Sequence, residues 1–206
     1  MKKLFLSLAV CLSSLGFAQD LSQNKAFNEV CAVISEHKIT KGAFNQTKLI
    51  KKISREIKSS GTFIVSGDDG VLWNTQKPFK SSSAITKSGI VQTAANGKKS
   101  VLSAGSNATF EQVSSLMASL FNGDSASLDK NFEIEFIGSA ENWNANLTPR
   151  DSAVRAFIRE IEMAGTGTIN TMVLHEPNGD FTKYEFSNHT FPDSLTEIEK
   201  SAFSEK

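Results

Sequence analysis

Cysteine, proline and tyrosine are scarce in this chain. Its 206 residues contain two cysteines, four prolines and one tyrosine. Cys11 lies in an N-terminal apolar run, so the rest of the chain keeps only Cys31 and cannot form an internal disulfide. Stability must therefore come from packing. Cys31 stands among Phe27, Val30 and Ile34, which predicts a buried small apolar side chain rather than a reactive thiol.

Neither sign of charge is in excess. The chain has 22 Lys and Arg residues against 22 Asp and Glu residues. Lys2 and Lys3 are the only charges in residues 1–18, so the remaining chain has 20 basic and 22 acidic residues, a formal charge of −2. Such a balance does not attract nucleic acid or an anionic membrane by bulk charge, and we expect no nucleic-acid partner.

The motifs of common enzyme classes are missing as well. The sequence has no Gly-x-Ser-x-Gly, no His-Glu-x-x-His, no glycine-rich phosphate loop before a helix and no Cys or His cluster for a metal. The three histidines are isolated, and each has an ordinary expected place: His37 at the end of a helix, His175 at the end of a strand and His189 in a loop. We expect no enzymatic activity, no metal site and no cofactor.

Two pairs of carboxylates are spaced as neighbours on one face of a strand. They are Glu133 with Glu135, and Glu160 with Glu162. Solvent-facing charges on half-buried strands explain both pairs without invoking acid or base chemistry.

The longest apolar run is too short to cross a membrane. Lys2 and Lys3 precede an apolar stretch over residues 4–15, and Gly16-Phe17-Ala18 places small residues where signal peptidase cleaves. A membrane-spanning helix needs about 20 apolar residues. We therefore predict a signal peptide over residues 1–18, cleaved after Ala18, and export to the periplasm.

A lipoprotein signal is the competing interpretation of the same segment. Leu8-Ala9-Val10-Cys11 loosely resembles a lipobox. Val10 is too large for the position before a lipidated cysteine, and Cys11 lies inside the apolar run rather than at its end. We expect Cys11 to be removed with the peptide, which leaves a protein with no lipid anchor of its own.

Residues 19–206 are long enough for one domain and too short for two comfortable ones. Within them, residues 22–37 and 109–121 show the three-and-four apolar spacing of amphipathic helices. Thr109 with Gln112 predicts a capping box for the second helix, and Gly123 predicts its end. Its apolar face comprises Phe110, Val113, Leu116, Met117, Leu120 and Phe121.

Alternating patterns predict short strands through most of the remaining chain. Gly67-Asp68-Asp69-Gly70 predicts a hairpin connection, and Asn96-Gly97 is the preferred pair of a type I′ turn. Residues 154–163 are ambiguous, with strand favoured, and the tail after Pro192 is expected to be a short helix or loop on the sheet edge. The expected strands are 39–50, 57–65, 71–73, 82–87, 90–93, 98–103, 132–136, 143–147, 168–174 and 181–186.

This order of elements predicts an α+β fold with one large, curved antiparallel sheet and helices on a single face. If the helices cover the concave side without filling it, the gap is an apolar cavity suited to a ligand. Thirteen phenylalanines remain after the predicted signal peptide, beside the single Tyr184, so most aromatic surface has no polar group. An ordinary core explains many of them, and the sequence alone leaves core and cavity lining open.

The order of several segments resembles the periplasmic outer-membrane lipoprotein carriers, the LolA-like proteins. ITKGAFNQTK, beginning at Ile39, resembles the Phe-x-Gln segment that opens the sheet of that family. In the expected order there follow SSGTFIVS (59–66), GVLWNTQKPF (70–79), AITKSGI (84–90), NANLTPRD (144–151) and EPNGDFTKYEF (176–186). The resemblance covers nearly the whole chain after the signal peptide.

The resemblance implies an incomplete β-barrel whose helices form a lid over a hydrophobic cavity. Relatives carry the acyl chains of lipoproteins from an inner-membrane release transporter to an outer-membrane acceptor. By position, Val71 and Trp73 match the cavity-lining pair, and Leu116, Met117 and Leu120 the lid. The residues expected to line cavity and lid are Phe44, Phe63, Val71, Trp73, Phe110, Val113, Leu116, Met117 and Leu120.

One departure from the family concerns the closing of the lid. Relatives hold the lid closed with an arginine just upstream of the aromatic block, where this chain has residues 65–69 without arginine.

Taken as a whole, the resemblance predicts a soluble, monomeric shuttle for lipid-modified proteins. The alternatives are a carrier of another lipid or glycolipid, or a non-catalytic structural β-protein.

Overall fold

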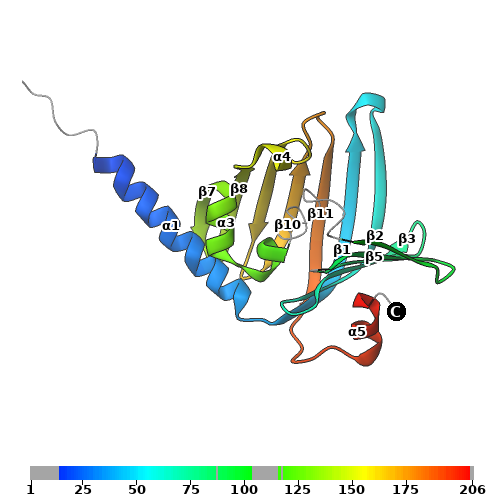
Figure 1. Cartoon of the computed structure of the whole chain (residues 1–206). Coiled ribbons are helices and arrows are strands. Elements are labelled where there is room, and N and C mark those ends of the chain that lie inside the picture. Colours follow the sequence, from blue (N-terminus) through cyan, green and yellow to red (C-terminus); the bar gives the residue numbers. More distant parts are fainter. Residues whose placement is uncertain (1–13, 87, 104–115, 117, 205–206) are drawn as a thin grey trace, which may run out of the picture.

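A single antiparallel sheet organises the chain (Figure 1). In the computed structural model we describe residues 14–86, 88–103, 116 and 118–204. Within them, eleven strands pair in the order β6-β5-β4-β3-β2-β1-β11-β10-β9-β8-β7. The strands are β1 Ile39–Ile50, β2 Arg55–Ser66, β3 Gly70–Lys77, β4 Ser81–Ile85, β5 Gly89–Ala94, β6 Lys99–Ser103, β7 Phe132–Ser139, β8 Asn142–Pro149, β9 Glu160–Gly165, β10 Ile169–His175 and β11 Phe181–Thr190.

The sheet is curved and open, as the sequence predicts. β1 pairs with β11 near its middle, while β6 and β7 at the two ends do not pair with each other. In Figure 1, β3 and β5 run across the view at a large angle to β7–β10. The α+β class and the incomplete barrel are therefore confirmed.

The two faces of the sheet carry separate apolar clusters because side chains alternate along each strand. On β2, Phe63 and Val65 belong to the main core, while Ile64 between them belongs to a smaller cluster with Leu72 of β3. We call the face of Phe63 and Val65 the inner face and that of Ile64 and Leu72 the outer face.

Helices cover the inner face. α1 (Ser14–Ser35) packs through Phe27, Val30 and Cys31 into the core, and its ring contact with β7 joins Phe27 to Phe136. α3 (Ser125–Asn131) begins at the cap Asp124, whose side chain accepts from the Ser127 N–H. Leu116 and residues 118–122 are also helical, and we call residues 118–122 the inner helical segment. Leu120 and Phe121 of this segment are buried in the core.

The C-terminal tail lies on the outer face rather than on the sheet edge that we predicted. α5 (Glu197–Phe203) opens with a capping box between Thr196 and Glu199. Leu195 and Phe203 pack with the outer-face cluster of Ile39, Ile64, Leu72, Ala84 and Val91. A continuous apolar surface on β2–β5 is better covered there than at an edge, which explains the difference.

Two local predictions need correction. The segment 154–163 is not one strand: α4 (Ser152–Arg155) begins it, because the Asp151 side chain accepts from the N–H groups of Ala153 and Val154. The turn at Asn96-Gly97 is not type I′, since the Ala94 N–H bonds the Lys98 carbonyl across three residues and only glycine there has positive φ. The short 3-10 turn η1 (Lys51–Ile53) connects β1 and β2.

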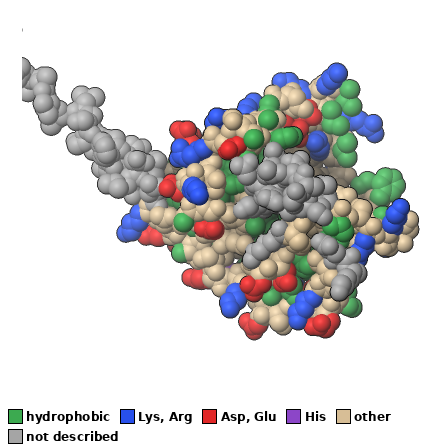
Figure 2. Space-filling model, viewed as in Figure 1, with side chains coloured by type: hydrophobic (Ala, Val, Ile, Leu, Met, Phe, Trp, Pro, Cys, Tyr) green, Lys and Arg blue, Asp and Glu red, His purple; other side chains and the backbone are tan. Residues whose placement is uncertain are grey.

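The surface carries mixed charge. Figure 2 shows Lys and Arg side chains interspersed with Asp and Glu over the visible face. Among the helices of the described residues, none has both the length and the hydropathy needed to cross a bilayer.

Candidate functional site

An aromatic cluster lines the inner face where the first strand, β1, pairs with the last, β11. Phe44 on β1 meets Trp73 on β3 edge-on with ring centroids 5.2 Å apart. Trp73 also lies 5.2 Å from Tyr184 on β11, and Phe63 on β2 lies 5.2 Å from Phe186. The antiparallel register places four strands side by side and so brings together residues more than a hundred positions apart.

The cluster has one polar end, at Tyr184. Gln46 on β1 donates from Nε2 to the Tyr184 hydroxyl at 3.1 Å, and the Ser59 hydroxyl donates to Gln46 Oε1. Burial raises the pKa of Tyr184 to about 12, although the hydrogen bond with Gln46 acts in the opposite direction. The phenol therefore stays neutral at physiological pH. Phe44 and Gln46 of the Phe-x-Gln segment thus face the same interior.

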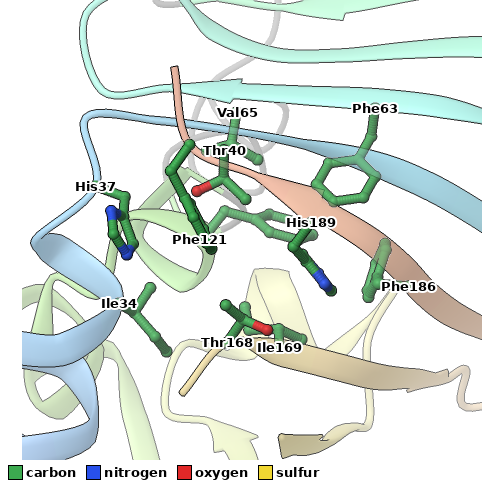
Figure 3. Close-up of a pocket in the computed structure, with 11 residues that line it drawn as sticks. Ile34, His37, Thr40, Phe63, Val65, Phe121, Thr168, Ile169, Phe186 and His189 are labelled. Carbon is green, nitrogen blue, oxygen red and sulfur yellow. The ribbon is translucent and has the colours of Figure 1, made fainter. Parts of the chain in front are cut away.

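A first pocket opens beside the aromatic cluster (Figure 3). It is narrow: the volume that the centre of a water molecule can reach is about 20 Å³. Phe63, Phe186 and Ile169 come from the sheet, Phe121 comes from the inner helical segment, and Ile34 comes from α1. The remaining lining residues are His37, Thr40, Val65, Thr168, His189 and Phe191.

A β-bulge turns His189 into this pocket. Lys41 pairs with Thr190 and Ala43 with Ser187, so Gly42 alone opposes Asn188 and His189. Asn188 has a φ of 55°, the left-handed conformation that such a bulge allows. His189 lines the same pocket as Phe186, which strict alternation would not permit across three residues.

The imidazole of His189 stands in an apolar setting. Its ring lies 5.8 Å from that of Phe63. Burial lowers the pKa of His189, and a hydrogen bond with the backbone of Ile169 only partly opposes this effect. The neutral ring is therefore the favoured form inside the pocket. At the mouth, His37 and Phe191 stack with centroids 3.7 Å apart.

A second pocket lies between α1 and the β7–β9 half of the sheet. It is equally narrow, about 20 Å³ by the same measure, and shares Ile34 with the first pocket. Leu120 lines the second pocket whereas its neighbour Phe121 lines the first, so the inner helical segment separates the two. The remaining lining residues are Phe27, Val30, Cys31, Leu128, Phe136, Trp143, Ala145, Leu147 and Met163.

Trp143 provides an unpaired polar group in the second pocket. The residue is 2% exposed, and its Nε1 has no hydrogen-bond partner among the described residues. It is the one such buried side-chain atom among the residues that the structure describes. A buried donor left unpaired costs about 1–3 kcal/mol. Cys31 in the same pocket stays a thiol, because burial and the nearby Asp124 raise its pKa to about 12.

The structure brings together most of the predicted site residues that it describes. Phe44, Phe63, Val71, Leu116 and Leu120 are buried in the inner core, and Trp73 is partly buried against it. Of the predicted residues that the structure describes, only Phe63 and Leu120 line the two pockets. Phe110, Val113 and Met117 lie outside the described residues.

Several pocket residues escaped prediction. Phe186 and Ile169 could have been found from the alternation of their strands. His189 could not, because the predicted strand stopped at residue 186 and the bulge has no sequence signature of its own. Trp143 was visible as an inward strand residue, but nothing in the sequence shows that its N–H lacks a partner.

The carboxylate pair on β9 lies away from both pockets. The Glu162 carboxylate lies 2.7 Å from His175 Nε2. One potential metal-ligand atom from each of Glu160, Glu162 and His175 lies within 4.8 Å of the others. Glu162 is 48% exposed at its side chain. This exposure of Glu162 agrees with the solvent-facing position that we predicted for the pair.

A family comparison bears directly on these pockets. Residues 35–203 match the family of outer membrane lipoprotein carrier protein LolA. The chain belongs to this family. The match runs from the end of α1 to the end of α5 and so includes every strand of the sheet. A search among curated proteins finds no significant match.

The solved structures that match this chain are distant in sequence. A DUF1329 family protein of Desulfovibrio piger matches with a TM-score of 0.49 and 13% identity, over 88% of this chain and 99% of that one. The lipoprotein LppX of Mycobacterium tuberculosis matches with 0.47 and 11%, over 86% and 100%. A LolA superfamily protein of Nitrosomonas europaea matches with 0.45 and 8%, over 85% and 96%.

Proposed function

We propose that this protein is a soluble periplasmic carrier that binds the acyl chains of lipoproteins and shuttles them from the inner to the outer membrane. The observation that carries the proposal is the pair of apolar pockets under the helical layer, in a chain of the LolA family. Burying an acyl chain is worth about 0.8 kcal/mol per CH₂. A lipid-modified protein therefore needs an escort to cross an aqueous compartment.

The arrangement is that of a carrier in its closed form. Leu120 and Phe121 stand between the pockets, and Phe121 contacts Trp73 and Phe186 at centroid distances of 5.9 and 5.7 Å. Moving the inner helical segment off the sheet would join both pockets over the aromatic cluster. Its apolar side chains would then face acyl chains in place of the sheet.

The proposal includes the address and the partners. Cleavage after Ala18 would remove the first five residues of α1 and leave the packed half, with Phe27, Val30 and Cys31, in place. The released protein would act as a monomer and exchange cargo with an inner-membrane lipoprotein-release transporter and an outer-membrane acceptor. It needs no cofactor and catalyses no reaction.

A second cargo class is favoured by one observation. At the position of the family's arginine, the β2–β3 turn holds Ser66 and Asp69, whose side chains bond at 2.7 Å. A turn that closes on itself offers no cation to latch a lid. The missing latch sets this chain apart from its relatives, so another amphiphile, such as a glycolipid, is the second candidate cargo.

The test is to isolate the exported protein and identify lipid extracted from it by mass spectrometry. A transfer assay then follows a triacylated peptide from inner-membrane vesicles to acceptor vesicles. We expect stoichiometric amphiphile and transfer that depends on the protein. Bound glycolipid without peptide transfer would favour the second cargo. A protein that retains no amphiphile and transfers none would leave the structural β-protein as the better description.

A further inference from the structure

The N–H of Trp143 is buried, and none of the residues that the structure describes accepts a hydrogen bond from it. Trp143 is on β8, its ring stacks at 24° on Phe136 of β7 with centroids 6.4 Å apart, and Phe27 of α1 packs on Phe136 in turn. The indole thus forms part of the floor of the second pocket under α1.

Both cross-strand neighbours of Trp143 are glycines. The register pairs it with Gly138 on β7 and with Gly165 on β9. A Cβ added at Gly165 would stand 2.7 Å from Cζ2 and 2.8 Å from Cε2 of the indole. The ring therefore occupies space that any other residue at 165 would take. The glycine at 165 therefore leaves room for the large indole ring, which carries the donor.

The lining of the pocket limits what can accept the hydrogen bond. Apart from Trp143 and the Cys31 thiol, every lining side chain is a hydrocarbon or thioether. A buried water molecule needs two to four polar partners, which these side chains do not supply. The acceptor must therefore arrive as part of an otherwise apolar molecule, and a carbonyl at the head of a hydrocarbon chain has this composition.

We infer that the second pocket binds the carbonyl end of a fatty-acyl group, with the Trp143 Nε1–H donating to the ester or amide oxygen. This inference rests on the proposed function, because it assigns an orientation to the acyl cargo of the same interior. The alkyl chain then extends along the apolar walls between α1 and the sheet. Trp143 fixes where the acyl chain begins, and hydrophobic burial supplies the remaining affinity.

The experiment compares methyl palmitate with octadecane, a probe of similar length that lacks the carbonyl. Trp143→Phe keeps an aromatic ring and removes the donor. We expect its affinity for methyl palmitate to fall about three- to tenfold, as for loss of one hydrogen bond, and its affinity for octadecane to stay within about twofold. Trp73→Phe, at the chain's other tryptophan, is the matched control. It should leave the difference in affinity between methyl palmitate and octadecane unchanged.

Nuclear magnetic resonance of the unmutated sequence gives a second readout. The chain has two tryptophans, so ¹⁵N-tryptophan labelling gives two indole N–H signals, and Trp143→Phe assigns them. Methyl palmitate should move the Trp143 signal downfield and octadecane should not. This readout still decides the question if Trp143→Phe fails to fold, because Trp73→Phe can supply the assignment.

The outcomes separate the two proposals. Equal losses for both probes would show that Trp143 acts through ring packing and would overturn the inference while leaving the carrier function intact. The inference would also be overturned if Trp143→Phe kept the full preference for methyl palmitate over octadecane. The same holds if methyl palmitate did not shift the Trp143 indole signal of the unmutated protein. Failure of the unmutated protein to bind either probe would overturn the proposed function itself.

Discussion

Single residues decide what the pockets can hold. The first pocket is apolar except for its threonines and two histidines, and only His189 is held against the aromatic cluster. Its lowered pKa means that a charge on the ring is unfavourable there. Protonation would place that charge beside any hydrocarbon in the pocket.

We expect cargo affinity and stability to fall on acidification through His189. The folded-state pKa lies below the ordinary 6.5, so the unfolded chain takes up the proton first. The stabilising contribution is complete above about pH 6.5 and is lost as the pH falls through the lowered value. Acyl-probe binding at about pH 7.5 and about pH 5 should show severalfold weaker binding at the lower pH.

Two substitutions test the origin of that pH dependence. His189→Phe should bind equally at both values once other groups are accounted for. His37→Gln is the matched control, since His37 is exposed at the mouth of the same pocket and should leave the dependence intact. A dependence that survives in His189→Phe would assign it to another group.

At the scale of elements, the outer face is held by one helix. α5 covers Ile64, Leu72 and Ala84, and Lys41 Nζ on β1 lies 2.7 Å from both carboxylate oxygens of Glu199. Partial burial acts to raise the pKa of Glu199, but hydrogen bonds from Lys41 and Thr196 outweigh it and lower the pKa. The helix is therefore tied to the sheet by a paired charge as well as by apolar contact.

We predict that α5 loosens when Glu199 is neutralised. Because the folded-state pKa is lowered, the contribution is present above the ordinary value of about 4.5 and is lost as the pH falls through the lowered value. Glu199→Gln should lower the free energy of unfolding by about 1 kcal/mol, because it removes the ion pair and weakens the capping box. Hydrogen exchange should quicken in α5 before the sheet.

The neighbouring residue Glu197 supplies the control. It pairs with Lys200 on the same helix, and their side chains are 89% and 52% exposed. Glu197→Gln should change neither exchange nor stability measurably. Equal effects of both substitutions would show that the Lys41 contact does not anchor the helix.

The same scale shows what the sequence could predict. A strand with regular alternation, such as β8, can be predicted because it has one buried face. The strand predicted over 181–186 ends four residues before the observed β11, because Ser187 and Asn188 interrupt the alternation where the bulge forms. The four-residue α4 was missed because its signal is a single cap at Asp151. Site residues fixed by such local irregularities require the structure.

For the whole molecule, the sheet and the helical layer have separate roles. The pairing of β1 with β11 joins the two halves of the open sheet beside the aromatic cluster, and the inner helical segment rests on both halves. Phe121 and Phe132 are both buried in the same core, but Phe121 lines the first pocket and Phe132 lines neither. Cargo binding should therefore depend on the side chain of Phe121 and not on that of Phe132.

We expect Phe121→Ala and Phe132→Ala each to lower the free energy of unfolding by about 3–5 kcal/mol without ligand. A ligand at about one hundred times its Kd stabilises the unmutated protein by about 2.7 kcal/mol, or about 5–10 °C in Tm for a chain of this size. The shift should be larger in Phe121→Ala, because the truncated ring leaves space that an acyl chain fills. In Phe132→Ala it should equal that of the unmutated protein. Equal shifts in both variants, measured by thermal unfolding with and without methyl palmitate, would mean that Phe121 is core and that cargo does not enter beside it.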